Sequence, residues 1–440
     1  MKDQRINFDF AGNGPALDAL NLTVNSKHSI HLSGHTGTGK TTLINKIKQA
    51  KFAMNKSVVV LAPDWHSANR IKGVSISRFF NLQDKGITSV LPEKLDKVKH
   101  SWDDLVFIRN LDLIIIYKVE NVSGQLLDIM DYMLRKIRGN TLPFGNIQVL
   151  TVGDHFNCAP HALKDFNGND VEGTNFFSSR SFQSLNMLHI CLRKCYANID
   201  PLHLEILNGI RTKRKCLKYF KILNEIVEKN RNKQTKRIRV TKRLSTAQWI
   251  NENGIKESIL NRITDRGRIE LNFQVYAREI KRLKRCFFAG EDGDYFTYRY
   301  SQIVFLEDAE DGSYKKGDIG IVTRGGGFGC ELDLSTLHVK LRWKRQNGYL
   351  IPPPVRVCQA IYISECIDVK LEYVEFELEE NEIHGKAHIA LAMCRSLKSL
   401  TFSRPLNLND VTSPDPIFAF DEIVKSSKAA NLVERALSDI

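Results

Sequence analysis

The chain has 440 residues, which is too long for one compact core and predicts two or three domains. Its 42% hydrophobic content excludes a disordered chain. The net charge of +14 is typical of proteins that bind a polyanion, because neutralised phosphates release counterions, although a basic surface that only aids solubility is the alternative. Because no apolar run approaches the roughly 20 residues that cross a bilayer and no signal peptide is evident, we expect an intracellular protein, in cytoplasm or nucleus, with no membrane association.

The nine cysteines are scattered and include no C-x-x-C pair. The closest two, Cys191 and Cys195, have no neighbouring cluster of metal ligands. This spacing predicts reduced thiols rather than a disulfide framework or a zinc site.

The first half of the sequence alternates strands with helices. Buried strands are predicted at 28–34, 57–63, 111–117 and 146–154, and helices at 41–52 and 123–140. The second of these helices is expected to end at Gly139-Asn140, a typical C-terminal cap. Strands that alternate with helices predict a doubly wound parallel sheet, and therefore an α/β fold.

The pattern changes after about residue 200. A helical stretch at 200–228 precedes a basic segment at 229–243 and a further α/β pattern at 250–285. Glycine turns and alternating residues predict an all-β region from 300 to 343. Strands at 357–363 and 374–380, a helix at 384–397 and an appended C-terminal helix complete the prediction.

One motif carries recognisable chemistry. The segment "GHTGTGKTT" (34–42) contains G-x-x-x-x-G-K-T between a predicted strand and a predicted helix, the context of a phosphate-binding P-loop. Backbone N–H groups of such a loop cradle phosphates at a helix N-terminus, and Lys40 would reach the β- and γ-phosphates. Thr41 would ligate Mg²⁺ if the ion is bound. The candidate ATP-binding residues are Gly34, Thr36, Gly37, Thr38, Gly39, Lys40, Thr41 and Thr42.

The strand "LDLIIIYKVEN" (111–121) ends in an unexpected pair of residues. In an open α/β sheet the ligand lies outside the carboxyl ends of the strands, so Tyr117 and Lys118 should face the nucleotide. Phosphoryl transfer with magnesium requires an acidic residue at such a position. The sequence offers a phenol and a cation there instead.

Longer segments resemble a known family. "LPFGNIQVLTVGDHFNCAP" (142–160), "NFFSSRSF" (175–182) and "LRKCYANIDPLHLEILNGIR" (192–211) are similar to the PIF-type DNA helicases, which are RecD-like superfamily 1B enzymes. The similarity weakens in the second half of the chain. It implies two RecA-like P-loop domains with doubly wound parallel sheets, ATP between them, and a small β-barrel inserted in the second. It also implies movement along single-stranded DNA in the 5′-to-3′ direction.

The resemblance gives expected domain boundaries. They are 1–190 for the first RecA-like domain, 191–299 and 351–412 for the two parts of the second, 300–350 for the inserted barrel, and 413–440 for a C-terminal tail.

Several catalytic residues of the family are replaced in this sequence. The resemblance places the magnesium-holding aspartate on Tyr117, the water-orienting glutamate on Lys118 and the arginine finger on Met393. Two family residues are retained. They are Asp154 and Arg193, and the resemblance implies that Arg193 is a γ-phosphate arginine in the second domain.

Other family positions are changed as well. The Gly-Asp-x-x-Gln motif ends in Asn157, and "SECID" (364–368) keeps none of its family counterpart. "APDWHSA" (62–68) introduces Asp64 and Trp65 where small residues let DNA approach. A shift in alignment would instead place Glu120 at the acidic position or Arg395 at the finger position.

Three hypotheses follow from these residues. The first is a degenerate helicase that keeps the fold and binds nucleic acid, most of all single-stranded DNA, together with a protein partner. In this hypothesis the protein has lost ATP hydrolysis and DNA unwinding. Whether it binds ATP is left open, and Thr41 would ligate Mg²⁺ if the ion is bound. The second is an active ATP-dependent 5′-to-3′ DNA helicase with diverged motifs. The third is a structural subunit of a larger nucleoprotein assembly.

Overall fold

The computed structural model describes residues 13–63, 67–68, 71–82, 95–156, 163–164, 170–171, 175–196, 199–211, 216–231, the strands named below between 238 and 376, and residues 391–392, 394, 396–406 and 415–440. The chain forms two compact units. Unit 1 comprises Met1–Asn198, Ile383–Lys386 and Thr412–Ile440, and unit 2 comprises Ile199–Glu382 and Ala387–Val411. The five domain boundaries expected from the sequence stay a prediction.

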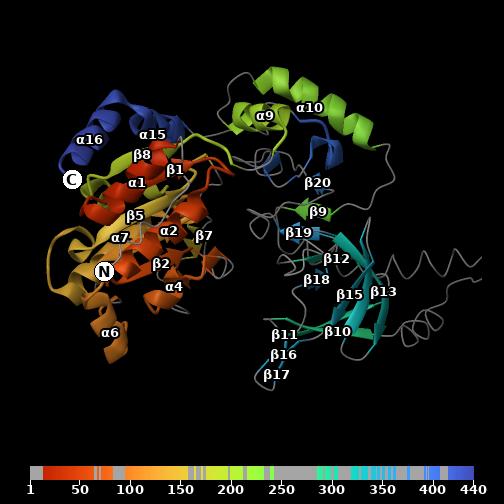
Figure 1. The fold of residues 1–440 in the computed structure, drawn as a ribbon, viewed down its shortest axis with the longest axis horizontal. Helices are drawn as coiled ribbons and strands as arrows, with labels where there is room; N and C mark the ends of the chain where they lie inside the picture. The colour runs from red at the N-terminus through yellow and green to blue at the C-terminus, as the bar shows by residue number, and fades with distance from the viewer. Residues whose placement is uncertain are drawn as a thin grey trace, which may run out of the picture. The chain divides into compact units, whose positions relative to one another are not determined.

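Unit 1 is built on a parallel sheet of six strands (Figure 1). Neighbouring strands pair in parallel in the order β3-β2-β4-β5-β1-β8. The strands are β1 (Ile30–Gly34), β2 (Val58–Ala62), β3 (Val74–Ser75), β4 (Leu113–Tyr117), β5 (Gln148–Gly153) and β8 (Leu188–Leu192). This confirms the predicted α/β fold and its parallel sheet, and four of the strands lie where the sequence predicted them.

Helices cover both faces of this sheet. They are α1 (Gly14–Asn25), α2 (Lys40–Ala53), α4 (Ile76–Phe79), α6 (Trp102–Arg109), α7 (Gly124–Arg138) and α8 (Arg180–Ser184). Successive residues of β4 point to opposite faces, as in any strand. Ile114 and Ile116 therefore join the core beneath α7, whereas Ile115 and Tyr117 join the core beneath α1 and α2. A short hairpin joins β6 (Leu163–Lys164) to β7 (Asp170–Val171).

Helix α7 begins and ends as its sequence predicts. The Ser123 hydroxyl accepts a hydrogen bond from the backbone N–H of Leu126 at 3.2 Å and caps the N-terminus. Gly139 takes the left-handed conformation at φ 64° after the last helical residue and caps the C-terminus.

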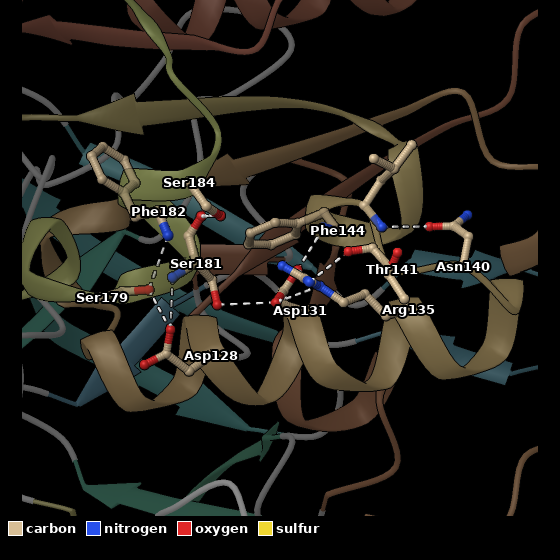
Figure 2. A network of polar contacts seen from close by, with 11 residues as sticks. Asp128, Asp131, Arg135, Asn140, Thr141, Phe144, Ser179, Ser181, Phe182 and Ser184 are labelled. Carbon is tan, nitrogen blue, oxygen red and sulfur yellow. Dashed lines mark hydrogen bonds and ion pairs between the residues drawn. The ribbon is translucent and has the colours of Figure 1, made fainter.

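Two segments that carry the family resemblance, around residues 144 and 180, form hydrogen bonds with aspartates of α7 (Figure 2). Asp131 accepts hydrogen bonds from the Phe144 backbone, in the 3₁₀ turn η2 (Pro143–Asn146), and from the Ser181 hydroxyl at 3.1 Å. Asp128 accepts from the Ser179 hydroxyl at 2.6 Å, between η3 (Phe176–Ser178) and α8. These contacts hold the turn before β5 and the segment before β8 against one helix. They therefore position the sheet rather than a ligand.

The C-terminal segment packs onto the edge strand of unit 1. It forms α15 (Asp415–Lys425) and α16 (Ser427–Ser438), so two helices stand where the sequence predicted one. Both helices contact β8. Phe420 and Val424 of α15 join the core beneath α7, whereas Ala436 of α16 joins the core on the opposite face. The helix pair therefore straddles β8.

Unit 2 contains a second parallel sheet. Its four strands lie in the order β19-β9-β20-β21 and are β9 (Ile238–Thr241), β19 (Ala360–Tyr362), β20 (Val374–Phe376) and β21 (Leu400–Phe402). Helix α10 (Cys216–Arg231) packs on β21 and on the turn η4 (Leu397–Ser399), and α9 (Pro201–Arg211) packs on α10. Asn230 fixes α10 there, since its amide donates to the carbonyls of Leu397 and Leu400 at 2.8 Å.

The remaining described strands of unit 2 are antiparallel. Five of them pair in the order β15-β14-β13-β12-β18, namely β12 (Gln302–Phe305), β13 (Ile319–Gly326), β14 (Gly329–Leu334), β15 (His338–Arg342) and β18 (Val355–Val357). Two hairpins join β10 (Arg285–Gly290) to β11 (Gly293–Tyr298) and β16 (Lys344–Gln346) to β17 (Tyr349–Ile351). Closure of the predicted all-β region into a barrel stays a prediction.

Within the part of the chain that the structure describes, no helix is both long and apolar enough to span a bilayer.

Candidate nucleotide-binding site

The P-loop has the predicted strand–loop–helix form. Strand β1 ends at Gly34 and α2 begins at Lys40. Gly37 and Gly39 both have φ at 85°, a conformation that only glycine adopts readily. A Cβ on Gly34 would lie 2.7 Å from the Thr38 hydroxyl and 3.0 Å from the Leu192 carbonyl, so this glycine is also required. The backbone therefore has the conformation that presents N–H groups to a phosphate at the start of a helix.

Lys40 lies folded over the loop. Its Nζ donates hydrogen bonds to the carbonyls of Gly34 at 2.6 Å and His35 at 2.9 Å. The loop is tightened by the Thr38 hydroxyl, which donates to the same His35 carbonyl at 2.8 Å. An incoming phosphate would replace these neutral carbonyl acceptors of Lys40 with negatively charged oxygens, so that both partners of the hydrogen bond carry charge.

Tyr117 occupies the end of β4 that faces the P-loop helix. Its side chain is only 4% exposed, and its hydroxyl lies 3.5 Å from the Thr41 hydroxyl. The resemblance places the magnesium-holding aspartate at this residue. A neutral phenol replaces that carboxylate, and Mg²⁺ is a hard cation that is bound through carboxylate oxygens and water. The donor groups at this position therefore do not fit Mg²⁺.

Lys118 turns the chain away from the strand. It has φ at 54°, in the left-handed region that is uncommon for residues with side chains, and it is buried. Its Nζ donates to the Ser67 hydroxyl at 3.2 Å and lies 5.9 Å from the centre of the Tyr117 ring. A lysine ammonium thus stands at the residue where the resemblance places the water-orienting glutamate.

Glu120 lies near the end of β5 without any slip of β4, because Tyr117 keeps its parallel pairing with Val152. The 3₁₀ turn η1 (Val119–Asn121) carries Glu120 there, and its Oε2 accepts a hydrogen bond from the Asp154 backbone at 3.2 Å. A Cβ on Gly153 would come within 1.9 Å of that oxygen. No pattern in the sequence predicts this contact between Glu120 and the end of β5.

The retained Asp154 is 1% exposed and directly follows β5. Its Oδ1 accepts a hydrogen bond from the Phe156 backbone at 3.2 Å and begins the turn after the strand. Asp154 and Glu120 are thus brought together, and both make backbone hydrogen bonds.

Arg193 belongs to unit 1, because it directly follows β8, whereas the sequence analysis assigned it to the second domain. Its side chain is exposed. Tyr196, in the same segment, contacts the P-loop directly and was missed by sequence reasoning. Its N–H donates to the Gly37 carbonyl at 2.8 Å, and the Lys194 ammonium lies 5.3 Å from its ring centre. The apolar run "LHICL" (188–192), had it been read as a strand, would have pointed to this segment.

The remaining expected site residues lie outside the described residues. They are Met393, Arg395, Asn157, Asp64, Trp65 and the segment 364–368. Among the residues that the structure does describe, no group of three or more His, Cys, Asp or Glu side chains could hold a metal ion.

Comparison with known sequences supports the resemblance in unit 1. The family model of the PIF1-like helicases matches residues 16–204. The chain is 29% identical over 195 residues to the ATP-dependent DNA helicase RRM3 of Saccharomyces cerevisiae, covering 44% of this chain and 26% of that protein. It is 31% identical over 189 residues to the ATP-dependent DNA helicase PIF1 of the same species, covering 42% and 21%. The matched part thus spans about a quarter of these relatives.

Solved structures share the fold over nearly the whole chain. Pif1 of Bacteroides sp in complex with ADP-AlF4 has a TM-score of 0.73 at 17% identity, covering 94% of this chain and 97% of that one. Pif1 of Candida albicans has a TM-score of 0.67 at 16% identity, covering 94% and 99%. Identities this low show the fold alone, which is that of RecA-like P-loop domains. The P-loop unit is thus similar in sequence to the PIF1-like helicases, and 94% of the chain shares the fold of a solved Pif1.

Proposed function

We propose that this chain is a degenerate PIF1-like helicase that binds nucleic acid and holds a nucleotide in its P-loop without hydrolysing it. The observation that carries the proposal is the Tyr117 hydroxyl, 3.5 Å from the Thr41 hydroxyl. It stands where hydrolysis would need a carboxylate.

Charge explains why this replacement matters. Phosphoryl transfer depends on neutralising the charge that develops on the γ-phosphate and on positioning the attacking water. Tyr117 supplies no charge for holding a metal. The Lys118 ammonium cannot accept a proton from water or orient it as a carboxylate does. Binding makes fewer demands, because the P-loop amides and Lys40 can neutralise phosphate oxygens directly.

The proposed nucleic-acid ligand is single-stranded DNA. The net charge of +14 supports a polyanionic ligand. A Bacteroides Pif1 of the same fold was solved in complex with ADP-AlF3 and single-stranded DNA, with a TM-score of 0.64 at 17% identity. A protein partner and an intracellular location, in cytoplasm or nucleus, complete the proposal.

Two titrations of the full chain test it. A fluorescent ATP analogue should bind with the same affinity in Mg²⁺ and in excess EDTA, because the donor groups do not fit the ion. A fluorescent single-stranded oligonucleotide should bind with an affinity that falls steeply as salt rises. Binding of the oligonucleotide but not of the analogue would favour a structural subunit of a nucleoprotein assembly. Binding of neither would contradict the proposal outright.

One observation favours the second candidate, an active 5′-to-3′ helicase. Glu120 and Asp154 are buried side by side at the end of β5 and could supply the missing acidity. An active enzyme would unwind a 5′-tailed duplex at saturating ATP. Glu120→Gln, which keeps the hydrogen bond to the Asp154 backbone but removes the charge, would then abolish unwinding. We expect no ATP-dependent unwinding from either form.

A further inference from the structure

The two C-terminal helices, residues 415–438, form what we call the C-terminal clasp, because they straddle the edge strand β8 (Figure 1). The two arms of the clasp meet different surfaces. The α16 arm packs Ala436, with Val433 and Leu437, on an aliphatic core that contains Leu188 and Ile190. The α15 arm inserts Phe420 on the other face of the strand, where the surroundings are aromatic.

Phe420 is the anchor of the α15 arm. It is 6% exposed and stacks on Phe177, with ring centres 4.5 Å apart and planes 9° from parallel. The other rings around it, together with Phe177, form what we call the Phe420 socket: His31, His155, Phe176, Phe182 and His189. Half of this socket therefore consists of imidazoles, which are apolar enough to pack only while they are neutral.

The described residues offer His31 no acceptor for a second proton. The Thr151 hydroxyl donates to the Met187 sulfur at 3.7 Å, so Nδ1 of His31 donates to the Thr151 oxygen at 2.9 Å. Its Nε2 has no hydrogen-bond partner among the residues that the structure describes. Burial and the nearby His189 and His155 rings hold the pKa of His31 well below its usual range. Protonation would bury a cation whose Nε2 has no acceptor in the described part of the chain.

Burial also disfavours the charged form of His189, whereas His155 has a negatively charged partner. Burial, with a smaller effect of His155, lowers the pKa of His189 to about 4. His155 has a carboxylate partner, since its Nε2 lies 3.0 Å from Oδ1 of Asp421 on the α15 arm. Burial raises the pKa of Asp421, but hydrogen bonds from His155 and Lys425 outweigh this and lower the pKa overall. The contact between His155 and Asp421 thus holds the arm, whereas protonation of His31 and His189 would expel it.

We propose that the C-terminal clasp is an acid-sensitive latch, in which protonation of His31 and His189 ejects Phe420 from its socket and releases the α15 arm before the sheet unfolds. His155, Asp421 and Lys425 oppose release. The inference does not depend on nucleotide binding or on the proposed function, because the Phe420 socket contains no P-loop residue.

Hydrogen exchange measured by mass spectrometry on the full chain tests this directly. The chain is labelled between pH 7.5 and 4.5, with rates corrected for the intrinsic effect of pH. Amides of α15 should lose protection as the pH falls, while those of β4 and β5 keep theirs. Equal protection of α15 and the sheet strands at every pH where the chain is folded would overturn the proposal.

Three variants test the direction in which the pH midpoint of α15 release shifts. His189→Phe keeps a ring but cannot be protonated, so the midpoint of α15 release should shift to lower pH. Asp421→Asn removes the opposing carboxylate, so the midpoint should shift to higher pH. His28→Phe changes an exposed histidine before β1 and should leave the midpoint unchanged. If His189→Phe fails to fold, the Asp421→Asn shift still decides, and no shift or a shift to lower pH contradicts the latch.

Discussion

The P-loop and the end of β4 lie at the same edge of one sheet, yet the P-loop keeps its expected residues and the end of β4 does not. The loop keeps every glycine that its backbone needs and the lysine that would meet phosphate. The end of β4 keeps the strand but carries Tyr117 and Lys118 in place of the two acids that the family resemblance implies. The residues expected to bind the nucleotide are thus retained, whereas the neighbouring residues expected to catalyse hydrolysis are replaced.

The difference shows which residues the fold itself demands. Gly34, Gly37 and Gly39 are required by backbone geometry and close packing, so their loss would disturb the loop even if no nucleotide ever bound. A catalytic carboxylate is required only by the reaction. Its replacement by a phenol that packs beneath α1 and α2 leaves the sheet intact.

The largest expected effect concerns the contact that fixes Glu120. Gly153→Ala would place a Cβ 1.9 Å from Glu120 Oε2, so the carboxylate must move and lose its hydrogen bond from the Asp154 backbone, which costs about 1.5–3 kcal/mol of unfolding free energy for a charged acceptor. Gly14→Ala, where nothing lies within 4 Å of the added Cβ, is the matched control and should be close to neutral. Urea unfolding of both variants measures the difference. Equal stability would show that Glu120 is not held against β5.

The second prediction concerns phosphate binding by the P-loop. Lys40→Ala should weaken binding of the fluorescent ATP analogue by about 10- to 100-fold, because it removes a charge-assisted hydrogen bond. Lys27→Ala, at an exposed position before β1, removes the same charge and should change nothing. Equal affinities of the two variants would mean that the P-loop no longer holds phosphate.

Acid should weaken the sheet that carries both regions. The pKa of His189 is about 4 in the folded chain, against 6.5 when exposed, so between these values the unfolded chain binds more protons. The unfolding free energy should therefore rise from pH 4 to 6.5, by about 2 kcal/mol, and level off above. Urea unfolding at each pH measures this. His189→Phe should remove the part of the rise that comes from His189, and the part that comes from His31, whose pKa is also lowered, should stay. The two regions are best compared at pH 7 or above.

Restoring the two acids should make the end of β4 resemble that of the PIF-type helicases. Tyr117→Asp places a carboxylate opposite Thr41, and Lys118→Glu adds the second acid next to it in the chain, so nucleotide affinity should become about tenfold stronger in Mg²⁺ than in EDTA. Tyr117→Phe removes only the hydroxyl and is the matched control, for which Mg²⁺ and EDTA should give the same affinity. A double variant that stays insensitive to EDTA would mean that other residues exclude the ion.

Much of unit 1 follows from local patterns in the sequence. Apolar runs such as 111–117, glycine spacing and the caps of α7 are determined by neighbouring residues, so the parallel sheet and the P-loop could be predicted. Tyr196 on the P-loop, Glu120 against Gly153, and Phe420 among the histidines could not be, because each depends on contacts between distant segments. The left-handed turn at Lys118 was also unforeseen, because lysine gives no signal for a positive φ.

The central claim is that nucleotide binding persists here without hydrolysis, and steady-state ATP turnover tests it most directly. Wild type and Lys40→Ala are assayed side by side, with Mg²⁺ and with or without single-stranded DNA. We predict that the two proteins give the same background rate and that DNA does not raise it. Turnover that DNA stimulates and Lys40→Ala abolishes would contradict the account.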